Sequence, residues 1–300
     1  MTTTDFDVFG LGTVVIDHQM IIPGYPARNS KVEAHNQHIQ VGGPVPTALV
    51  QLTRWGQQCG FAGSWADDPH GQMISEDLTV EGVDTSISTI HEGGRSGVAQ
   101  VWIEKEVGSR TIACHRGSHT LEPFSLPQTR LLHLDGWSHT ASIHAAEQVR
   151  EQGGTVVLDT GSPKPGLSEL LPLVHVLICP SHFMEKYFQD DDALAGARTL
   201  LEIGPRLVIH TRGENGATAY FEDRKFHQPA HAVEAVDTTG AGDIFCAGII
   251  FGELKNWSIE QKMAFAASAA AFKCRGIGNR DALPTLQETE SLASLMNSSR

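Results

Sequence analysis

Apolar residues recur with two different spacings in the second half of the chain. Short, nearly continuous apolar runs, such as 155–160 (TVVLDT), alternate with longer segments in which apolar residues return every three or four positions. The first pattern is typical of strands buried on both faces, and the second is typical of helices. We therefore predict strands at 130–136, 155–160, 174–180, 206–212 and 232–236, and helices at 142–154, 166–171, 182–203 and from 243 onward.

The first half of the chain contains the same alternation together with hairpin-forming pieces. Residues 96–106 and 110–115, joined by Val-Gly-Ser, alternate apolar and polar side chains and predict a hairpin. The segment 44–56 begins with prolines and ends at a glycine, as helices often do. The remaining pattern predicts strands at 5–12, 32–41 and 59–66 and a helix at 68–82.

Strand–helix alternation with short connections predicts an α/β fold, in which helices cover both faces of a mainly parallel sheet. The segments at about 13–40 and 96–115 do not fit the alternation, and we expect them to form a small β-sheet lid. No linker or repeat divides the chain, so we expect a single domain, 1–300, that includes the lid. Open strand edges and an apolar lid face, for which Val98, Val101 and Ile103 are candidates, predict a homodimer through the lids.

The segment 236–250 (VDTTGAGDIFCAGII) places two glycines and Asp243 directly before a helix with almost no polar face. We expect this helix to be covered on most sides, and its start to lie beyond the carboxyl end of a strand, where ligands bind in parallel sheets. Gly240 and Gly242 let backbone amides converge at the positive end of the helix, which predicts an anion hole for a phosphoryl group. The same helix end should keep Asp243 ionised, so that it accepts a proton from an alcohol. The alternative is an aspartate that only caps the helix.

Composition narrows the class of protein. A formal net charge of −13 argues against nucleic-acid binding, which requires basic surface. Five widely spaced cysteines without a Cys-x-x-Cys pair are typical of reduced thiols, and no signal peptide or membrane span is visible, so we expect a cytoplasmic protein. There is no P-loop, and GLGTVV (10–15) lacks the third glycine of a dinucleotide fingerprint.

Four segments resemble motifs of the ribokinase-like (phosphofructokinase B) carbohydrate kinases. DTTGAGDIFCAGI resembles the C-terminal signature of that family, and VGGPVPTALVQLTRWG resembles the N-terminal signature. TRGENG resembles its nucleotide-binding turn, and FKCRGIGNR resembles the segment that covers the adenine. The resemblance spans nearly the whole chain. It implies a three-layer α/β/α sandwich with a β-sheet lid, and ATP-dependent phosphorylation of a sugar's primary hydroxyl with Mg²⁺; K⁺ is a further candidate cofactor.

The resemblance also implies roles for particular residues. Asp243 corresponds to the catalytic base, and Gly240, Ala241 and Gly242 to the anion hole. Asp17 corresponds to the acidic residue that holds sugar hydroxyls, although it could instead cap a turn after the first strand. The other candidates are Gly42, Gly43, Thr47 and Lys31 for the sugar, and Thr211, Gly213, Gly216, Lys273, Gly276 and Asn279 for ATP.

The chain departs from the ribokinase pattern at three places. Pro44 and Thr47 stand where ribokinases have lysine and asparagine, so ribose specificity is not implied. The pattern Gly-Gly-Pro-x-x-Thr is closer to the sulfofructose-kinase-like branch of the family. Of the basic and amide residues expected to bind a sulfonate, however, this chain has an obvious counterpart only in Lys31. Cys114 and Trp137 stand where polar partners would be needed. The family's Asn-x-x-Glu motif reads Ser181 to Met184, which leaves Glu185, one place later, as the metal candidate.

These features predict an ATP-dependent kinase for a small furanose-forming sugar, a ketohexose or a pentose. Asp17 and the net charge favour a neutral acceptor. A sulfosugar kinase, a nucleoside kinase and a catalytically silent sugar or nucleotide sensor are the alternatives. A nucleoside kinase would need an aromatic slot for the base, for which Trp65, Trp102 and Trp137 are candidates.

Overall fold

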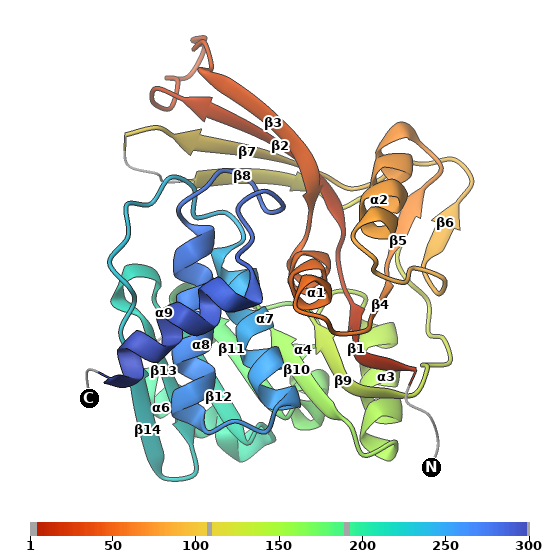
Figure 1. Cartoon of the computed structure of the whole chain (residues 1–300). Helices are drawn as coiled ribbons and strands as arrows, with labels where there is room; N and C mark the ends of the chain where they lie inside the picture. The colour runs from red at the N-terminus through yellow and green to blue at the C-terminus, as the bar shows by residue number, and fades with distance from the viewer. Residues whose placement is uncertain (1–4, 107–109, 189–192, 299–300) are drawn as a thin grey trace.

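The computed structural model describes residues 5–106, 110–188 and 193–298. Its middle layer is an eight-stranded sheet in the order β14-β13-β12-β11-β10-β9-β1-β4 (Figure 1). Neighbouring strands from β4 to β12 run parallel, and β13 and β14 extend the sheet antiparallel. The strands are β1 (Phe6–Leu11), β4 (Cys59–Ala62), β9 (Thr129–Leu134), β10 (Thr155–Asp159), β11 (Val176–Pro180), β12 (Leu207–Thr211), β13 (Ala217–Phe221) and β14 (Arg224–Gln228). The predicted mainly parallel sheet is confirmed.

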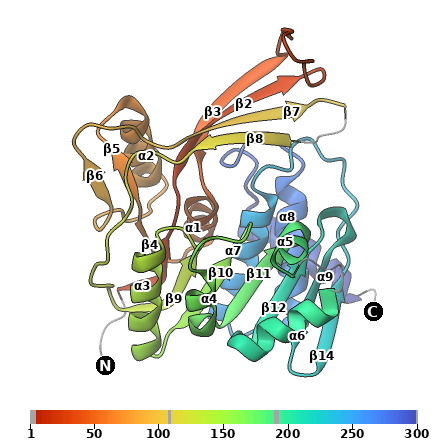
Figure 2. The same cartoon turned by 180° about the vertical axis from the view of Figure 1, so that it is seen from behind.

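Helices cover both faces of this sheet. On one face lie α1 (Pro44–Arg54), α7 (Ala241–Leu254), α8 (Ile259–Lys273) and α9 (Leu286–Ser298) (Figure 1). On the other lie α3 (His139–Glu151), α4 (Leu167–Leu170), α5 (Ser181–Phe188) and α6 (Ala193–Ile203) (Figure 2). Adjacent residues of one strand pack toward opposite layers: Val8 and Val157 join the core beneath α1 and α7, whereas Phe9 and Val156 join the core beneath α3.

The helix α7 is buried along nearly its whole length, from Ile244 to Leu254, as its apolar sequence predicts. It packs closely against α8, because a Cβ at Gly248 would lie only 2.5 Å from the Cα of Ala266. This close packing fixes the direction in which the start of α7 points.

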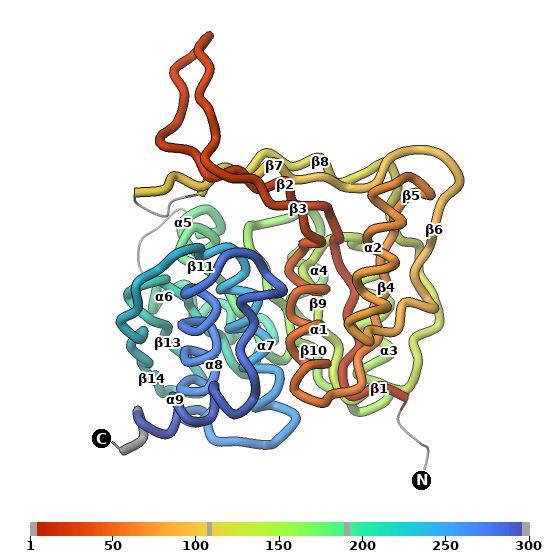
Figure 3. The backbone as a smooth tube through the Cα atoms, turned by 45° about the horizontal axis from the view of Figure 1, so that its top comes forward, coloured from red at the N-terminus to blue at the C-terminus, as the bar shows by residue number. Residues whose placement is uncertain are grey.

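A second sheet, in the order β3-β2-β7-β8, lies above the carboxyl ends of the main strands, and its β2–β3 hairpin projects beyond the body of the protein (Figures 1 and 3). It consists of β2 (Val15–Ile22), β3 (Asn36–Gly42), β7 (Val98–Glu104) and β8 (Arg110–His115). The strands β2 and β7 are parallel, and the two outer pairings are antiparallel. The predicted lid sheet is therefore confirmed, and we call these four strands the lid. The predicted Val-Gly-Ser connection, 107–109, lies outside the described residues.

The two faces of the lid differ from the expected pattern. Val101 and Ile103 are buried and, by the strand register, share a face with Asp17, whereas Val98 lies on the opposite face. Side chains alternate along a strand, so these three valine and isoleucine residues cannot form one apolar surface. The outer face instead exposes Ile39 and Trp102.

Several predicted boundaries also change. The predicted strand 232–236 is an exposed loop without a partner strand, and the predicted strand 32–41 begins only at Asn36. The segment 59–66 divides into β4 and β5 (Ser64–Ala66), and β5 pairs with β6 (Thr89–His91) beside α2 (Pro69–Val80). The hairpin β13–β14 was not predicted. Within the described ranges, no helix is both long and apolar enough to cross a membrane.

Candidate active site

The loop before α7 is held in place by one carboxylate. Asp237 Oδ1 accepts the amide N–H of Thr239 at 2.8 Å, and its Oδ2 accepts that of Gly278 at 3.0 Å. Gly240 then adopts a left-handed conformation, with φ of 79°, and α7 begins at the next residue. A side chain at this position would oppose that turn, which is the physical reason for the glycine.

The start of α7 offers fewer free amides for an anion hole than the sequence predicts. The amide of Ala241 donates to the carbonyl of Thr238 at 3.2 Å, because the tight turn brings them together, so it is not free to bind an anion. In the described part of the chain, the amides of Gly242 and Asp243 have no acceptor, and a Cβ at Gly242 would meet no atom within 4 Å. Two amides at the positive end of the helix are therefore unpaired, and the space beside Gly242 is open.

The protonation state of Asp243 differs from the expectation. Burial and the neighbouring Asp159 raise the pKa of the Asp243 carboxyl to about 8, although the charge of Arg110 lowers it. Burial also raises the pKa of Asp159 to about 6. The helix end alone does not keep Asp243 ionised, because loss of hydration outweighs the helix dipole.

Asp17 lies on β2, on the lid face that is turned toward this loop, and only 7% of it is exposed. Burial raises the pKa of Asp17 to about 7, and the charge of Arg280 lowers it. Gly42 on β3 pairs with Val15 and lies diagonally across from Asp17, and a Cβ there would overlap the carboxylate of Asp17. Gly43 turns the chain into α1 with φ of 111°, in a position where a Cβ would overlap the carbonyl of Thr13. Gly42 therefore leaves room for Asp17, and Gly43 allows the turn into α1.

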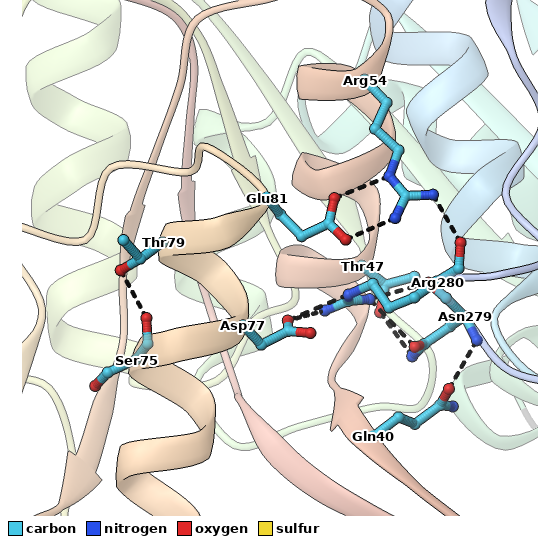
Figure 4. A network of polar contacts seen from close by, with 9 residues as sticks. All are labelled: Gln40, Thr47, Arg54, Ser75, Asp77, Thr79, Glu81, Asn279 and Arg280. Carbon is cyan, nitrogen blue, oxygen red and sulfur yellow. Dashed lines mark hydrogen bonds and ion pairs between the residues drawn. The ribbon is translucent and has the colours of Figure 1, made fainter.

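Asn279 joins the lid to the helical layer. Its amide N–H donates to Gln40 Oε1 at 2.8 Å, and its side-chain Nδ2 donates to Thr47 Oγ1 at 3.2 Å (Figure 4). The predicted sugar ligand Thr47 is thus fully buried with its oxygen already bonded. Asn279, predicted to bind ATP, instead links β3 to α1.

Two ion pairs extend this network to α2. Arg280 lies 2.8 Å from Asp77, and Arg54 lies 2.6 Å from Glu81 (Figure 4). Since Arg280 also lowers the pKa of Asp17, α2 holds in place a cation that acts on the sugar-binding candidate.

Lys273 is also placed differently from the prediction. It is fully buried, and its Nζ donates to the carbonyl of Asp237 at 2.7 Å and lies 3.3 Å from Asp237 Oδ2. A buried ammonium needs such a partner, so Lys273 stabilises the loop before α7 and is not available to ATP. The carbonyl of Gly276 is 3.5 Å from the same Nζ.

A cavity of about 630 Å³ lies between the loop after β14 and the ends of α8 and α9. The predicted adenine segment contributes Phe272 and Arg275 to it, whereas Lys273, Gly276 and Asn279 do not line it. Its walls are His231, Ala232, Val233, Glu234, Val236, Phe272, Arg275 and Leu292. These walls combine apolar side chains with His231, Glu234 and Arg275, and the sequence missed most of them.

The predicted nucleotide turn, with Thr211 at the end of β12, forms tightly. Gly213 and Gly216 have φ of 55° and 76°, and a Cβ at Gly216 would overlap the carbonyl of Gln228. None of the three residues lines the cavity.

Arg110 is a site residue that the sequence did not indicate. Its Nη1 donates to Thr238 Oγ1 at 3.0 Å and to the Thr238 carbonyl at 3.3 Å. It therefore brings a positive charge from β8 of the lid to the loop before α7. Lys31, by contrast, lies between β2 and β3 with 87% of its side chain exposed, 4.0 Å from Glu33, and is not brought to Asp17.

Glu185, the predicted metal candidate, is exposed on α5. The preceding Met184 is buried in the core, so the helix does not turn Glu185 inward. The described residues contain no group of three or more His, Cys, Asp or Glu that could hold a metal ion.

A lid over the carboxyl edge of a parallel sheet, with a carboxylate beside free amides, defines a phosphotransferase of the ribokinase fold. The model of the pfkB family carbohydrate kinases matches residues 6–286. The chain therefore belongs to the pfkB family of carbohydrate kinases.

Comparison with individual proteins supports this family membership. The chain is similar to a ribokinase of Haemophilus influenzae, with 25% identity over 93% of this chain and 95% of the relative. It is also similar to the ketohexokinase of Mus musculus, with 26% identity over 88% and 94%. The structure of Arabidopsis thaliana ribokinase complexed with ribose and ATP has a TM-score of 0.84, with 20% identity over 97% of this chain and 99% of that one, and shares the fold.

Proposed function

We propose that this enzyme transfers the γ-phosphoryl group of ATP to a primary hydroxyl of a small furanose-forming sugar, a pentose or a ketohexose. The observation that carries the proposal is Asp243 at the start of α7, beside the free amides of Gly242 and Asp243 and within electrostatic range of Asp17. A base, an anion hole and a hydroxyl acceptor thus share one site. The named relatives act on such sugars, and a neighbour of the same fold binds ribose and ATP.

In the proposed reaction, Asp243 accepts the proton of the sugar hydroxyl as the hydroxyl oxygen bonds to the γ-phosphorus. The bond from the γ-phosphorus to the β–γ bridging oxygen breaks, and ADP leaves with that electron pair. The amides of Gly242 and Asp243 stabilise the charge on the transferring group, and Arg110 adds a positive charge from the lid. Asp17 orients the sugar by accepting hydrogen bonds from its hydroxyls.

The base of ATP is proposed to occupy the cavity lined by Phe272 and Val236. Asp159 acts electrostatically on Asp243, and carboxylate oxygens are preferred ligands of Mg²⁺, so we propose this end of the sheet for the ion, although the described residues hold no group of three or more metal-binding side chains. When bound with ATP, Mg²⁺ neutralises phosphate charge. Asp159 and Asp243 are the residues that would face it; the exposed Glu185 is not.

The three tryptophans do not support a nucleoside acceptor. Trp65 is buried in the core, and Trp102 lies on the outer face of the lid. The ring of Trp137 is covered by Arg116, whose Cζ is 3.8 Å from its centroid. None of them offers an open slot for a base beside Asp17.

The test is ATP-dependent phosphorylation with Mg²⁺ across a panel of pentoses, ketohexoses and nucleosides, with the phosphorylated position located by NMR. The Asp243→Asn variant should fold and should lose about 10²–10⁴-fold in turnover. Asp223→Asn, in the exposed turn between β13 and β14, is the matched control and should retain activity. Transfer to nucleosides alone, or full activity of the Asp243 variant, would contradict the proposal.

A further inference from the structure

Two basic side chains share the ring of Trp137. Arg116, just after β8 of the lid, stacks on the ring with its Cζ 3.8 Å from the centroid. Lys164, in the loop after β10, has its Nζ 5.5 Å from the same centroid. The two cations come from different sheets and meet at this ring.

Neither cation is neutralised by an ion pair. Among the described residues, no carboxylate lies within 4.0 Å of Arg116 or Lys164. Lys164 Nζ donates to the carbonyls of Thr160 and Ser162, which fixes its place without cancelling its charge. Burial lowers the pKa of Lys164 and the charge of Arg116 lowers it further, whereas the charges of Asp135 and Asp159 raise it without forming a direct ion pair.

Asp135, which acts on Lys164, is already bonded to two backbone amides. Asp135 Oδ2 accepts the amide of Thr13 at 2.7 Å, and its Oδ1 accepts the amide of Trp137 at 2.9 Å. Asp135 therefore positions the indole and leaves the two cations without a direct partner. Stacking also leaves the guanidinium N–H donors of Arg116 pointing outward in the plane of the group, where they can bind an anion in a bidentate manner.

The pair borders the place where the acceptor sugar is proposed to bind. The thiol of Cys114 on β8 experiences both charges, because Arg116 lowers its pKa and Asp17 raises it. On the other side, Lys164 acts on Asp159, which in turn acts on Asp243. The geometry agrees, because Asp135 joins Trp137 to Thr13, which lies just before β2 and four positions before Asp17.

We infer that Arg116 and Lys164, held on Trp137, form an anion-binding subsite, so that the acceptor is a sugar carrying a carboxylate, phosphate or sulfonate group. This inference rests on the proposed kinase function and replaces the expectation of a neutral acceptor. The net charge of −13 does not oppose it, because a local pair of cations determines recognition at contact distance.

The experiment compares kcat/KM for fructose with kcat/KM for fructose 6-phosphate, 6-deoxy-6-sulfofructose and a keto-sugar acid, 5-dehydro-2-deoxygluconate. At least one anionic sugar should be preferred by tenfold or more, and the panel distinguishes the three anions. A preference for neutral fructose over all three would overturn the inference and leave the kinase function standing.

The variants separate the subsite from general effects. Arg116→Gln should lower kcat/KM for the preferred anionic sugar about 10- to 100-fold, mainly through KM, and leave the neutral sugar within threefold. Arg116→Lys, which keeps the charge but loses the planar donors, should recover part of the loss. Arg28→Gln, the same change in the exposed connection between β2 and β3, is the matched control and should have no effect. Equal losses on neutral and anionic sugars would refute the subsite.

Calorimetric binding of the same sugars without ATP tests the subsite apart from catalysis. If no sugar is phosphorylated, the proposed function fails. The subsite is then supported if Arg116→Gln weakens binding of an anionic sugar. It is refuted if the variant binds the sugar as well as the wild type does, or if the wild type does not bind any anionic sugar.

Discussion

Replacing Asp243 by asparagine should stabilise the folded protein at alkaline pH while it removes activity. Burial raises the pKa of this carboxyl from 3.8 to about 8, so between these values the folded state holds a proton that the unfolded chain has lost. The stabilising contribution of the group is therefore complete below about pH 4 and is lost as the pH rises toward 8. A shift of about four pH units, at about 1.4 kcal/mol each, corresponds to a loss on the order of 5 kcal/mol.

The assay is urea unfolding of the wild type and Asp243→Asn between pH 5 and pH 9. Because an amide does not titrate, the variant's advantage in unfolding free energy should grow by a few kcal/mol across this range. Asp223→Asn, in an exposed turn, should follow the wild type. If the variant's advantage in unfolding free energy does not change with pH, burial of Asp243 is refuted as the cause of a raised pKa.

The same pKa predicts the pH dependence of catalysis. Since kcat/KM reports the free enzyme, it should rise with pH from about 6 to about 8 as the carboxyls of Asp17 and Asp243 ionise. Their apparent values belong to a coupled group that includes Asp159. A kcat/KM that is constant over this range would show that the base is already ionised in the free enzyme.

Three further predictions concern Asp17, Lys273 and the outer face of the lid. Asp17→Ala should leave the Kd of ATP unchanged and lower kcat/KM for the sugar by about 1.5–3 kcal/mol; an equal loss in ATP affinity would assign Asp17 to general structure. Lys273→Met should leave Asp237 without its buried partner and cost about 3–5 kcal/mol of unfolding free energy, with little change in cavity binding of a nucleoside; normal stability would contradict the loop-holding role. The protein should form a homodimer through the lid face that exposes Ile39 and Trp102. In sedimentation at micromolar concentration, Trp102→Ser should shift the protein toward monomer, and a monomeric wild type would exclude this interface.

Local sequence patterns determined much of the fold. The continuous apolar runs specify parallel strands because such strands are covered on both faces, and the lack of a polar face on 243–254 predicts the burial of α7. The same local patterns do not report a partner strand. For this reason 232–236 resembles a strand but remains an exposed loop, while the antiparallel hairpin β13–β14 was missed.

Motifs identified Asp243 and Asp17 because their chemistry is expressed in a few neighbouring residues. They could not assign Lys273 and Asn279, whose contacts with Asp237 and Gln40 span 36 and 239 positions of the chain. The pKa of Asp243 likewise depends on burial by distant segments. The sequence by itself thus determined the class of fold and proposed the reacting groups, since both depend on local pattern. Only the tertiary structure decided which cations are ion-paired, as Lys273 is, and which, such as Arg110, Arg116 and Lys164, have no carboxylate within 4.0 Å among the described residues, because an ion pair depends on distance in space.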